Sequence, residues 1–206
     1  MLLADIGNTR AHIFDGKSVL HVSNDEFIAK YKNTQLFYIC VNQSITSQIK
    51  HLSLWKDISD SLYIKGEYKT MGCDRKALCL SHENGIFVDA GSAITVDIVK
   101  NGVYQGGFIL PGIKAYLDTY KAISPALDIE LNLKCDLGSL PLTTKDGISY
   151  GIIASIKALI DIHSQDLQLY LTGGDGKWLS SFFHDSIFDE FLIFEGMKKA
   201  LKDKKC

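Results

Sequence analysis

Apolar residues fall in short runs at the start of the chain and again near its middle. Residues 2–6 and 86–90 form two such runs, which predict buried strands, and each ends in the sequence Asp-x-Gly. A second β-rich run follows in both places and leads to a turn dipeptide, Asp15-Gly16 or Asn101-Gly102. Such dipeptides between β-rich runs are the strongest short-range signal for a hairpin. After the second turn the pattern predicts a further strand at 103–110.

The two blocks form an internal repeat. Asp5 and Gly7 recur 84 residues later as Asp89 and Gly91. A repeat of this length is too long for a solenoid and favours two similar halves that face each other across a cleft. We expect residues 1–84 and 85–206 to form these halves, and the terminal helix could pack back on the first. The alternative is chance, because Asp-x-Gly is a common turn sequence.

Helical spacing is clearest between Thr143 and His163. Thr143 and Asp146 have the spacing of a capping box, with Asp in place of Glu. Two stripes of side chains run along this helix. The apolar stripe comprises Ile148, Ile152, Ile156, Leu159 and Ile160. The small stripe consists of residues with small side chains, Gly147, Gly151, Ser155 and Ala158. An interior glycine costs about 1 kcal/mol relative to alanine. We therefore expect another backbone to pack closely on the small stripe, from this chain or from a second copy.

Shorter patterns predict the other elements. Strands are predicted at 36–41, 168–171 and 191–194, and helices at 44–54, 75–81, 176–183 and 196–205. Thr172-Gly173-Gly174 would connect a strand to a helix, and its glycines could let the backbone approach a ligand such as adenine or ribose. A plain connection is the alternative. This mixture of strands and helices predicts an α/β fold.

Composition excludes several classes of protein. The chain has 206 residues, 46% hydrophobic and 22% charged, as is ordinary for globular proteins, and its net charge of −2 disfavours a nucleic-acid partner. No apolar run approaches the roughly 20 residues that span a bilayer. The start of the chain lacks the basic and apolar segments of a signal peptide, and the five cysteines form no CxxC pair. We therefore expect free thiols and a cytoplasmic protein.

The two Asp-x-Gly loops suggest phosphate binding. A glycine with positive φ lets successive backbone N–H groups point at one anion, and an adjacent aspartate can hold a metal directly or through water. Two such loops would bind the phosphates and Mg²⁺ of a nucleotide from both sides. Neither loop is a P-loop or a GxGxxG motif, and two ordinary hairpins remain the alternative.

Gly72-Cys73-Asp74-Arg75 stands at the start of a predicted helix. An aspartate there is often only a cap, and the neighbouring arginine often forms a surface ion pair of little energetic value. These residue types alone leave the function of the segment open.

Five segments in this order resemble the type III pantothenate kinase family. They are Asp5-Ile6-Gly7-Asn8-Thr9, Gly72-Cys73-Asp74-Arg75, the stretch from Asp89 to Asp97, Gly106-Gly107-Phe108-Ile109-Leu110-Pro111-Gly112 and Leu171-Thr172-Gly173-Gly174. The resemblance implies an acetate and sugar kinase/Hsp70/actin fold, with two ribonuclease H-like halves around a nucleotide cleft. It also implies ATP-dependent phosphorylation of pantothenate to 4′-phosphopantothenate, the first step of coenzyme A biosynthesis. A homodimer that needs Mg²⁺ and a monovalent cation, K⁺ or NH₄⁺, is implied as well.

The resemblance assigns site residues by motif. The first phosphate loop would comprise Asp5, Ile6, Gly7, Asn8, Thr9, Arg10, Ala11 and His12, with Asp5 near Mg²⁺, and Ser92 would contact ATP. Asp89 would bind the monovalent cation. Gly72, Cys73, Asp74, Arg75 and Thr144 would contact pantothenate, with Asp74 as the general base. The family's substrate-contacting tyrosine is assigned to Tyr68, with Tyr63 as the alternative. The family usually has threonine at Ser92 and a proline-containing loop before Gly72, which this chain lacks.

Two other functions remain open at this point. One is a kinase of the same fold that acts on another small molecule, although the Gly72–Arg75 motif argues against it. The other is a non-catalytic, actin-like nucleotide-binding or regulatory protein, in which Asp74, Arg75 and Thr144 would have no shared task.

Overall fold

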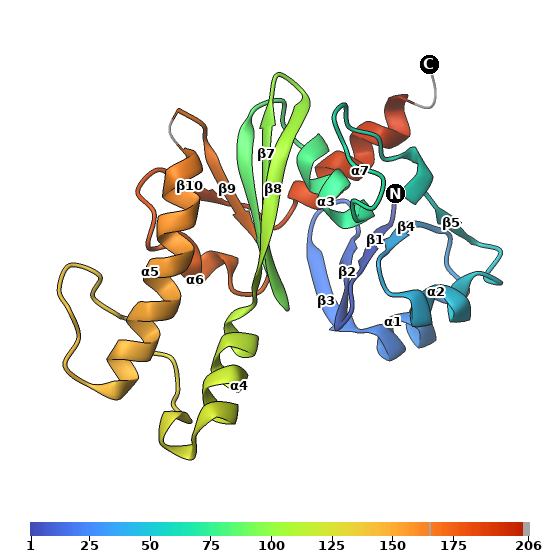
Figure 1. The fold of residues 1–206 in the computed structure, drawn as a ribbon. Coiled ribbons are helices and arrows are strands. Elements are labelled where there is room, and N and C mark those ends of the chain that lie inside the picture. The colour runs from blue at the N-terminus through green and yellow to red at the C-terminus, as the bar shows by residue number, and fades with distance from the viewer. Residues whose placement is uncertain (165, 204–206) are drawn as a thin grey trace. The chain divides into compact units, whose positions relative to one another are not determined.

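The computed structural model describes residues 1–164 and 166–203, and within them the chain forms two five-stranded sheets flanked by helices (Figure 1). Contacts divide the chain into two compact units. The first comprises residues 1–84 and 97–106 with the described residues from Asp189 onward, and the second comprises 85–96 and 107–188. The predicted halves, 1–84 and 85–206, were defined by the sequence repeat, whereas these units are defined by contacts. The division into two halves therefore stays a prediction.

The first unit holds a mixed sheet. Its strands are β1 (Leu3–Ile6), β2 (Arg10–Phe14), β3 (Val19–Ser23), β4 (Leu36–Cys40) and β5 (Trp55–Asp57), in the order β3-β2-β1-β4-β5. β2 lies antiparallel to β1 and β3, whereas β4 lies parallel to β1 and β5. The helices are α1 (Asn24–Tyr31), α2 (Gln43–Ile49), α3 (Cys73–Leu80) and α7 (Leu192–Asp203). Helices α1 and α2 turn their apolar faces towards this sheet. The buried core there includes Phe27 of α1 and Ile45 and Ile49 of α2.

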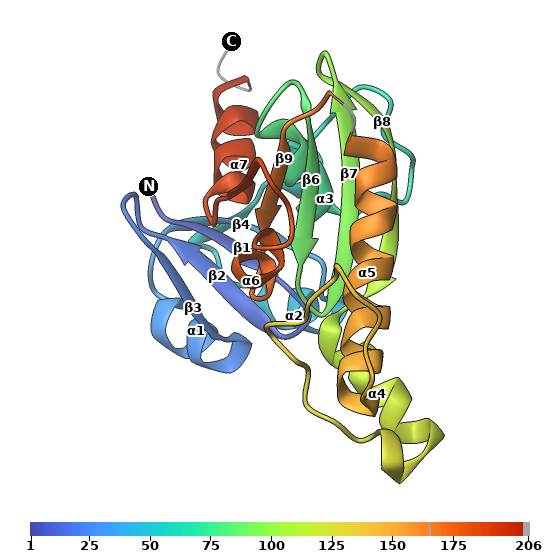
Figure 2. The same ribbon diagram turned by 90° about the vertical axis from the view of Figure 1, so that its left-hand side faces the viewer.

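The second sheet has strands β6 (Gly85–Ala90), β7 (Ala93–Lys100), β8 (Val103–Pro111), β9 (Leu169–Thr172) and β10 (Ser186–Phe188). Its order is β10-β9-β6-β7-β8, with β9 parallel to β6 and β10. The helices are α4 (Ile113–Ile123), α5 (Thr144–Ser164) and α6 (Gly176–Ser180). Figure 2 shows α5 lying along this sheet, and the ring of His163 on α5 is 5.8 Å from that of Phe108 on β8.

The two sheets share one topology. In each, the first strand of the block is central, the next two strands follow on one side, and two later strands lie on the other. The internal repeat is therefore a repeat of structure as well as of sequence. The second hairpin has the predicted turn: Asn101 and Gly102 have φ of 52° and 69°, as a type I′ turn requires.

The predicted cap of the long helix α5 is confirmed. The hydroxyl of Thr143 accepts a hydrogen bond from the N–H of Asp146 at 3.1 Å and donates one to the Asp146 carboxylate at 2.7 Å. Four of the five predicted apolar positions are buried, but Leu159 is 38% exposed, so the apolar stripe is narrower than predicted. The glycines of the small stripe meet no other backbone: a Cβ at Gly147 would have nothing within 4 Å, and one at Gly151 only the Tyr120 hydroxyl.

The prediction of a strand at 191–194 is wrong. These residues lead into α7, and the last described strand is β10. A short apolar run cannot by itself distinguish a strand from a buried helix. Here the apolar positions continue at helical spacing, and Leu192, Ile193, Phe194, Met197 and Ala200 are all buried. The predicted helices 44–54 and 176–183 end early, at Ile49 and Ser180. Cys206 and the last two residues of the predicted helix 196–205 lie outside the described residues.

Helix α3 packs against α7 at a close contact (Figure 1). Gly196 of α7 lies so near Ala77 of α3 that an added Cβ would be 1.8 Å from the Ala77 carbonyl oxygen. Only a glycine allows this approach, and it fixes the position of the helix that begins with Cys73. None of the described helices is both long enough and apolar enough to cross a membrane.

Replacing Gly196 with alanine should therefore destabilise the protein. The added methyl group would clash with backbone that cannot move alone, and we expect a loss of about 1–3 kcal/mol in the free energy of unfolding. Gly174→Ala is the matched control, because this glycine is exposed and a Cβ there would have nothing within 4 Å. The control should change the free energy of unfolding by less than about 0.5 kcal/mol, as exposed substitutions usually do. Urea denaturation measures both, and a Gly196→Ala variant as stable as the parent would contradict the contact.

Candidate functional site

The segment Gly72–Arg75 forms the start of α3. Gly72 is the N-cap, with extended backbone, and Asp74 lies in the first turn. The Asp74 carboxylate accepts a hydrogen bond from the N–H of Arg75 at 2.8 Å. It folds back over the N-cap, where a Cβ on Gly72 would lie 2.4 Å from its Oδ1. Gly72 thus makes room for the carboxylate.

The environment of Asp74 raises its pKa. Burial is the main cause, and the charge of Asp97 adds to it, while the Arg75 N–H bond and the Arg75 charge act in the opposite direction. A carboxylate with a raised pKa is a stronger base than an exposed one. The position of Asp74 therefore suits proton transfer as well as capping.

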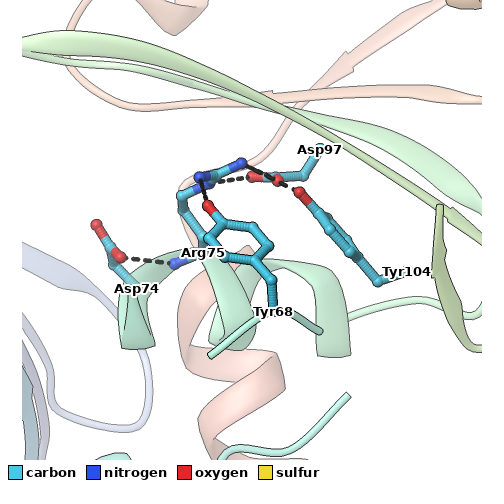
Figure 3. Close-up of polar contacts among 5 residues, drawn as sticks. All are labelled: Tyr68, Asp74, Arg75, Asp97 and Tyr104. Carbon is cyan, nitrogen blue, oxygen red and sulfur yellow. Dashed lines mark hydrogen bonds and ion pairs between the residues drawn. The ribbon is translucent and has the colours of Figure 1, made fainter. Parts of the chain in front are cut away.

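Arg75 forms a buried ion pair with Asp97 of β7 (Figure 3). Its Nε and Nη2 donate to the two carboxylate oxygens of Asp97 at 2.9 and 2.5 Å. Arg75 is 7% exposed and Asp97 0%. A buried charge needs such a partner, and burial works to lower the pKa of Arg75, but the bonds with Asp97 outweigh it and raise that pKa.

Two tyrosine hydroxyls complete this cluster (Figure 3). Nη1 of Arg75 donates to Tyr68, and Nη2 also donates to Tyr104 of β8 at 3.3 Å. These bonds occupy most of the N–H groups of the guanidinium. Tyr104 is 8% exposed, whereas Tyr68 is 41% exposed, so Tyr68 is the member that can also meet a ligand. Tyr63, the alternative from sequence, is 68% exposed.

The segment that carries Tyr68 is held at several points. Glu67 accepts hydrogen bonds from the N–H of Ile64 at 3.0 Å and from Nζ of Lys76 on α3 at 2.7 Å. The N–H of Tyr104 donates to the carbonyl of Lys65 at 2.8 Å. Tyr68 is therefore fixed both to α3 and to β8.

The first Asp-x-Gly loop connects β1 to β2. The N–H of Gly7 donates to the Arg10 carbonyl at 3.0 Å, and a Cβ on Gly7 would lie 3.3 Å from that oxygen. Two asparagine side chains from other elements donate to loop carbonyls, Asn24 to Gly7 at 3.2 Å and Asn42 to Asn8 at 3.3 Å. Neither Gly7 nor Gly91 has positive φ, so close contacts rather than a left-handed backbone select glycine at Gly7.

The structure brings this loop and the start of α3 together. Burial raises the pKa of the Cys73 thiol to about 11, a hydrogen bond with Ser59 opposes the rise, and the nearby carboxylates of Asp74 and Asp5 add to it. The thiol is therefore protonated at neutral pH. Asp5 itself is buried at the end of β1, with 6% exposure.

His12 lies on β2, opposite Asp5 in the strand register. Burial, then the neighbouring His21 and Arg10, lower the pKa of His12 to about 4. Its imidazole is therefore neutral at pH 7. At neutral pH His12 can therefore take part in hydrogen bonds but carries no charge.

The second Asp-x-Gly loop is held by two glycines of its own unit. The N–H of Gly112, the N-cap of α4, donates to the Ser92 carbonyl at 3.2 Å. A Cβ on Gly112 would lie 2.4 Å from the Gly91 carbonyl oxygen. Gly173, with φ of 87°, approaches Asp89 and Ala90 from the end of β9, and a Cβ there would lie 2.4 Å from Asp89 Oδ1. The predicted Thr172-Gly173-Gly174 loop thus lies against this candidate cation site.

Thr144 is exposed in the first turn of α5 and belongs to the second unit, as do Asp89 and Ser92. The remaining candidates belong to the first unit, where Asp5, Cys73, Asp74, Arg75 and Tyr68 form one connected group.

Four residues of the site were not predicted as such. Asp97 and Tyr104 complete the Arg75 cluster, and Asn24 and Asn42 hold the first loop. Asp97 carried a signal, since an acid inside an apolar strand requires a partner. For Asn24 and Asn42 the sequence gave no signal except the preference of asparagine for the start of a helix.

Comparison with known proteins identifies the family. The pattern of the family described as type III pantothenate kinase matches residues 48–165. A type III pantothenate kinase of Campylobacter jejuni (strain RM1221) is 42% identical over 204 residues, which cover 98% of this chain and 97% of that protein.

Solved structures agree on the fold. A crystal structure described as a "conserved putative Baf family transcriptional activator" from Campylobacter jejuni has a TM-score of 0.91 and 39% identity, covering 100% of this chain and 99% of that one. Component A of the (R)-2-hydroxyglutaryl-CoA dehydratase of Acidaminococcus fermentans, at 13% identity, has a TM-score of 0.55 with 98% of both chains covered. The predicted α/β fold, with two sheets of one topology, is confirmed. The chain belongs to the type III pantothenate kinase family.

Proposed function

We propose that the protein transfers the γ-phosphoryl group of ATP to the primary hydroxyl of pantothenate. The product is 4′-phosphopantothenate, and the reaction is the first step of coenzyme A biosynthesis. Family membership over nearly the whole chain carries this proposal. We place the reaction in the cytoplasm, with small-molecule partners and with neither nucleic acid nor membrane.

Asp74 is the proposed general base. An alcohol is a weak nucleophile, and a fixed carboxylate of raised pKa can accept or orient its proton in line with the γ-phosphate. The rest of the catalysis is positioning and electrostatics, as in other phosphoryl transfers. Gly72, Cys73, Tyr68 and Thr144 are proposed to contact pantothenate. Arg75 would contact it through the one N–H group of Nη1 that Asp97 and the tyrosines leave.

ATP is proposed to contact Asp5, Ile6, Gly7, Asn8, Thr9, Arg10, Ala11 and His12 of the first loop and Ser92 of the second. Asp5 fits a role near Mg²⁺, because its buried carboxylate offers the hard oxygen that Mg²⁺ prefers. When bound, Mg²⁺ neutralises phosphate charge. Asp5 would hold the ion directly or orient one of its waters.

Asp89 is proposed to hold the monovalent cation, K⁺ or NH₄⁺. The Asp89 carboxylate and the Ala90 carbonyl both face Gly173, where a Cβ would lie 2.4 and 2.6 Å from their oxygens. Carboxylate and carbonyl oxygens are suitable ligands for a hard cation. Because Gly173 has no side chain, its backbone can approach both oxygens closely.

Release of ADP with and without pantothenate tests the proposal directly. A pantothenate kinase releases ADP quickly only when pantothenate is present. A kinase for another small molecule would respond to that molecule instead. A regulatory protein, as the description of the Campylobacter jejuni structure suggests for that chain, would show slow hydrolysis that pantothenate does not change.

Asp74→Asn should lower kcat by about 10²–10⁴-fold, the usual contribution of a general base. Asparagine keeps the size and the oxygen that accepts the Arg75 N–H, so ATP affinity should hardly change. Steady-state kinetics at saturating pantothenate and a nucleotide titration measure the two effects. If Asp74 is only a cap, kcat should stay within about threefold of the parent, because asparagine caps equally well.

The pH profile provides a second readout for Asp74. Because burial raises its pKa, Asp74 takes up a proton at a higher pH than an exposed aspartate does. Activity of the parent should therefore fall as the pH drops through this raised pKa. The residual activity of Asp74→Asn should lack that acid limb, and a limb unchanged in the variant would assign it to another group.

Asp89→Asn should flatten the dependence of the rate on K⁺ or NH₄⁺. The substitution removes the charge that balances the cation but keeps the shape of the side chain. Rates are compared at constant ionic strength with K⁺, NH₄⁺ and Na⁺, and Na⁺ should be a poor substitute in the parent. If the rate of the parent enzyme does not depend on these ions, Asp89 is not the ligand of a monovalent cation.

The protein is proposed to form a homodimer through the small stripe of α5. Gly147, Gly151, Ser155 and Ala158 are all exposed, and Ile162 on the same helix is 62% exposed. A surface of small and apolar side chains allows a second copy to pack closely.

Gly151→Leu should weaken this dimer by adding volume where the partner approaches, at a cost of about 1–3 kcal/mol. Lys145→Leu, at another exposed position of α5, controls for the added apolar surface. Light scattering across a dilution series should show dissociation of the Gly151→Leu variant alone. A folded variant that stays dimeric like the control would exclude the stripe as the interface.

A further inference from the structure

We propose that Asp97 and Tyr104 are positioning residues of the substrate site, because they hold the guanidinium of Arg75 in the orientation that turns its Nη1 towards Tyr68. The inference rests on the proposed function, since it assumes that Arg75 and Tyr68 contact pantothenate. Asp97 and Tyr104 lie outside the motif around Asp74. They act through Arg75 and need not touch the substrate.

Asp97 fixes the plane of the guanidinium. It accepts hydrogen bonds from two nitrogens of Arg75, with Nε 2.9 Å from Oδ2 and Nη2 2.5 Å from Oδ1. Two parallel bonds to a planar group define its orientation as well as its position, whereas a single bond would let it turn. Because Nε and Nη2 both face Asp97, the third nitrogen, Nη1, points away from it. Nη1 is the nitrogen that donates to the Tyr68 hydroxyl.

Tyr104 closes the group on the same side as Asp97. Its hydroxyl accepts a hydrogen bond from Nη2 of Arg75 at 3.3 Å and is also hydrogen-bonded to Asp97. Burial and then the charge of Asp97 raise the pKa of Tyr104. The hydroxyl therefore keeps its proton at neutral pH and can donate it to the carboxylate. Figure 3 shows the three side chains together.

The three side chains come from separate elements, which limits their movement. Arg75 lies on α3, which packs against α7, and Asp97 and Tyr104 lie on the neighbouring strands β7 and β8. The N–H of Tyr104 also donates to the carbonyl of Lys65 at 2.8 Å. Residues that orient a binding group work best on such rigid elements.

Exposure increases from Asp97 towards Tyr68. Asp97 is 0% exposed and Tyr104 8%, whereas Tyr68 is 41% exposed. The Tyr68 ring packs on this group, with its centroid 5.8 Å from Cζ of Arg75 and 6.1 Å from the centroid of the Tyr104 ring. A substrate would therefore meet the Tyr68 side. Asp97 and Tyr104 support that side from the interior.

The test removes each positioning contact with little change of shape. Asp97→Asn replaces one acceptor oxygen of the ion pair with an amide, and Tyr104→Phe removes only the hydroxyl. Tyr38→Phe is the matched control, because Tyr38 is a tyrosine of the same unit that is 4% exposed and packs on Trp55 at 5.9 Å between ring centroids. Steady-state kinetics with each substrate varied gives KM and kcat, and circular dichroism verifies folding.

We expect KM for pantothenate to rise about three- to tenfold in Tyr104→Phe and about tenfold or more in Asp97→Asn, since bonds to a charged group are the stronger ones. KM for ATP should not change. The value of kcat should stay within about threefold of the parent, as when binding alone is lost, because the bond between Asp74 and the Arg75 N–H remains. Tyr38→Phe should match the parent in both KM values.

A double substitution tests whether Tyr104 acts through Arg75. In a background that carries both Arg75→Gln and Asp97→Asn, the pair is neutral and the guanidinium is gone. Tyr104→Phe should then have no further effect on KM for pantothenate, because contacts that act as a unit are not additive. An equal rise in both backgrounds would overturn the inference.

Other outcomes also decide against it. Folded Tyr104→Phe with the KM of the parent would overturn the inference, whether or not Asp97→Asn folds. Equal rises of KM for ATP and pantothenate would do the same, since they would indicate general damage. A parent that phosphorylates pantothenate beside such variants would leave the proposed function standing. A parent that does not phosphorylate pantothenate would refute both.

Discussion

The buried pair of Arg75 and Asp97 is the constraint on which the candidate substrate site depends. Removing two charges from water is costly, and a pair of this kind is retained only with good geometry and further hydrogen bonds. Both conditions are met, because Asp97 receives two N–H groups and the tyrosine hydroxyls receive others. Loss of one partner would leave a buried charge, at a typical cost of about 3–5 kcal/mol. The pair thus fixes Tyr68 beside the helix turn that carries Asp74 (Figure 3).

The same helix is fixed from two other directions. α7 approaches it at Gly196 as closely as a glycine permits, and Glu67 joins Lys76 to the segment before it. A base works only if its carboxylate stays in place during the reaction. The packing around α3 therefore serves the chemistry proposed for Asp74, although none of these contacts would touch the substrate.

The two Asp-x-Gly loops show how one sequence motif is supported in two ways. The first is held by the side chains of Asn24 and Asn42. The second is held by close backbone contacts, for which Gly112 and Gly173 leave room. At the second loop the Asp89 carboxylate and the Ala90 carbonyl lie together beside Gly173, which suits the proposed cation, whereas the first loop is the one proposed to bind phosphate. The structural repeat therefore need not imply a repeat of function.

Local signals in the sequence determined much of this protein. The repeat, the turn at Asn101-Gly102 and the cap of α5 depend on residues close together in the chain, and the structure confirms them. The motif around Asp74 suggested the candidate site, and the roles of its residues stay a prediction. Only the tertiary structure decided that 191–194 begins a helix, because short apolar runs suit either element until their neighbours are known. It alone paired Arg75 with Asp97, since a hydrogen bond across 22 residues depends on packing that no local pattern encodes.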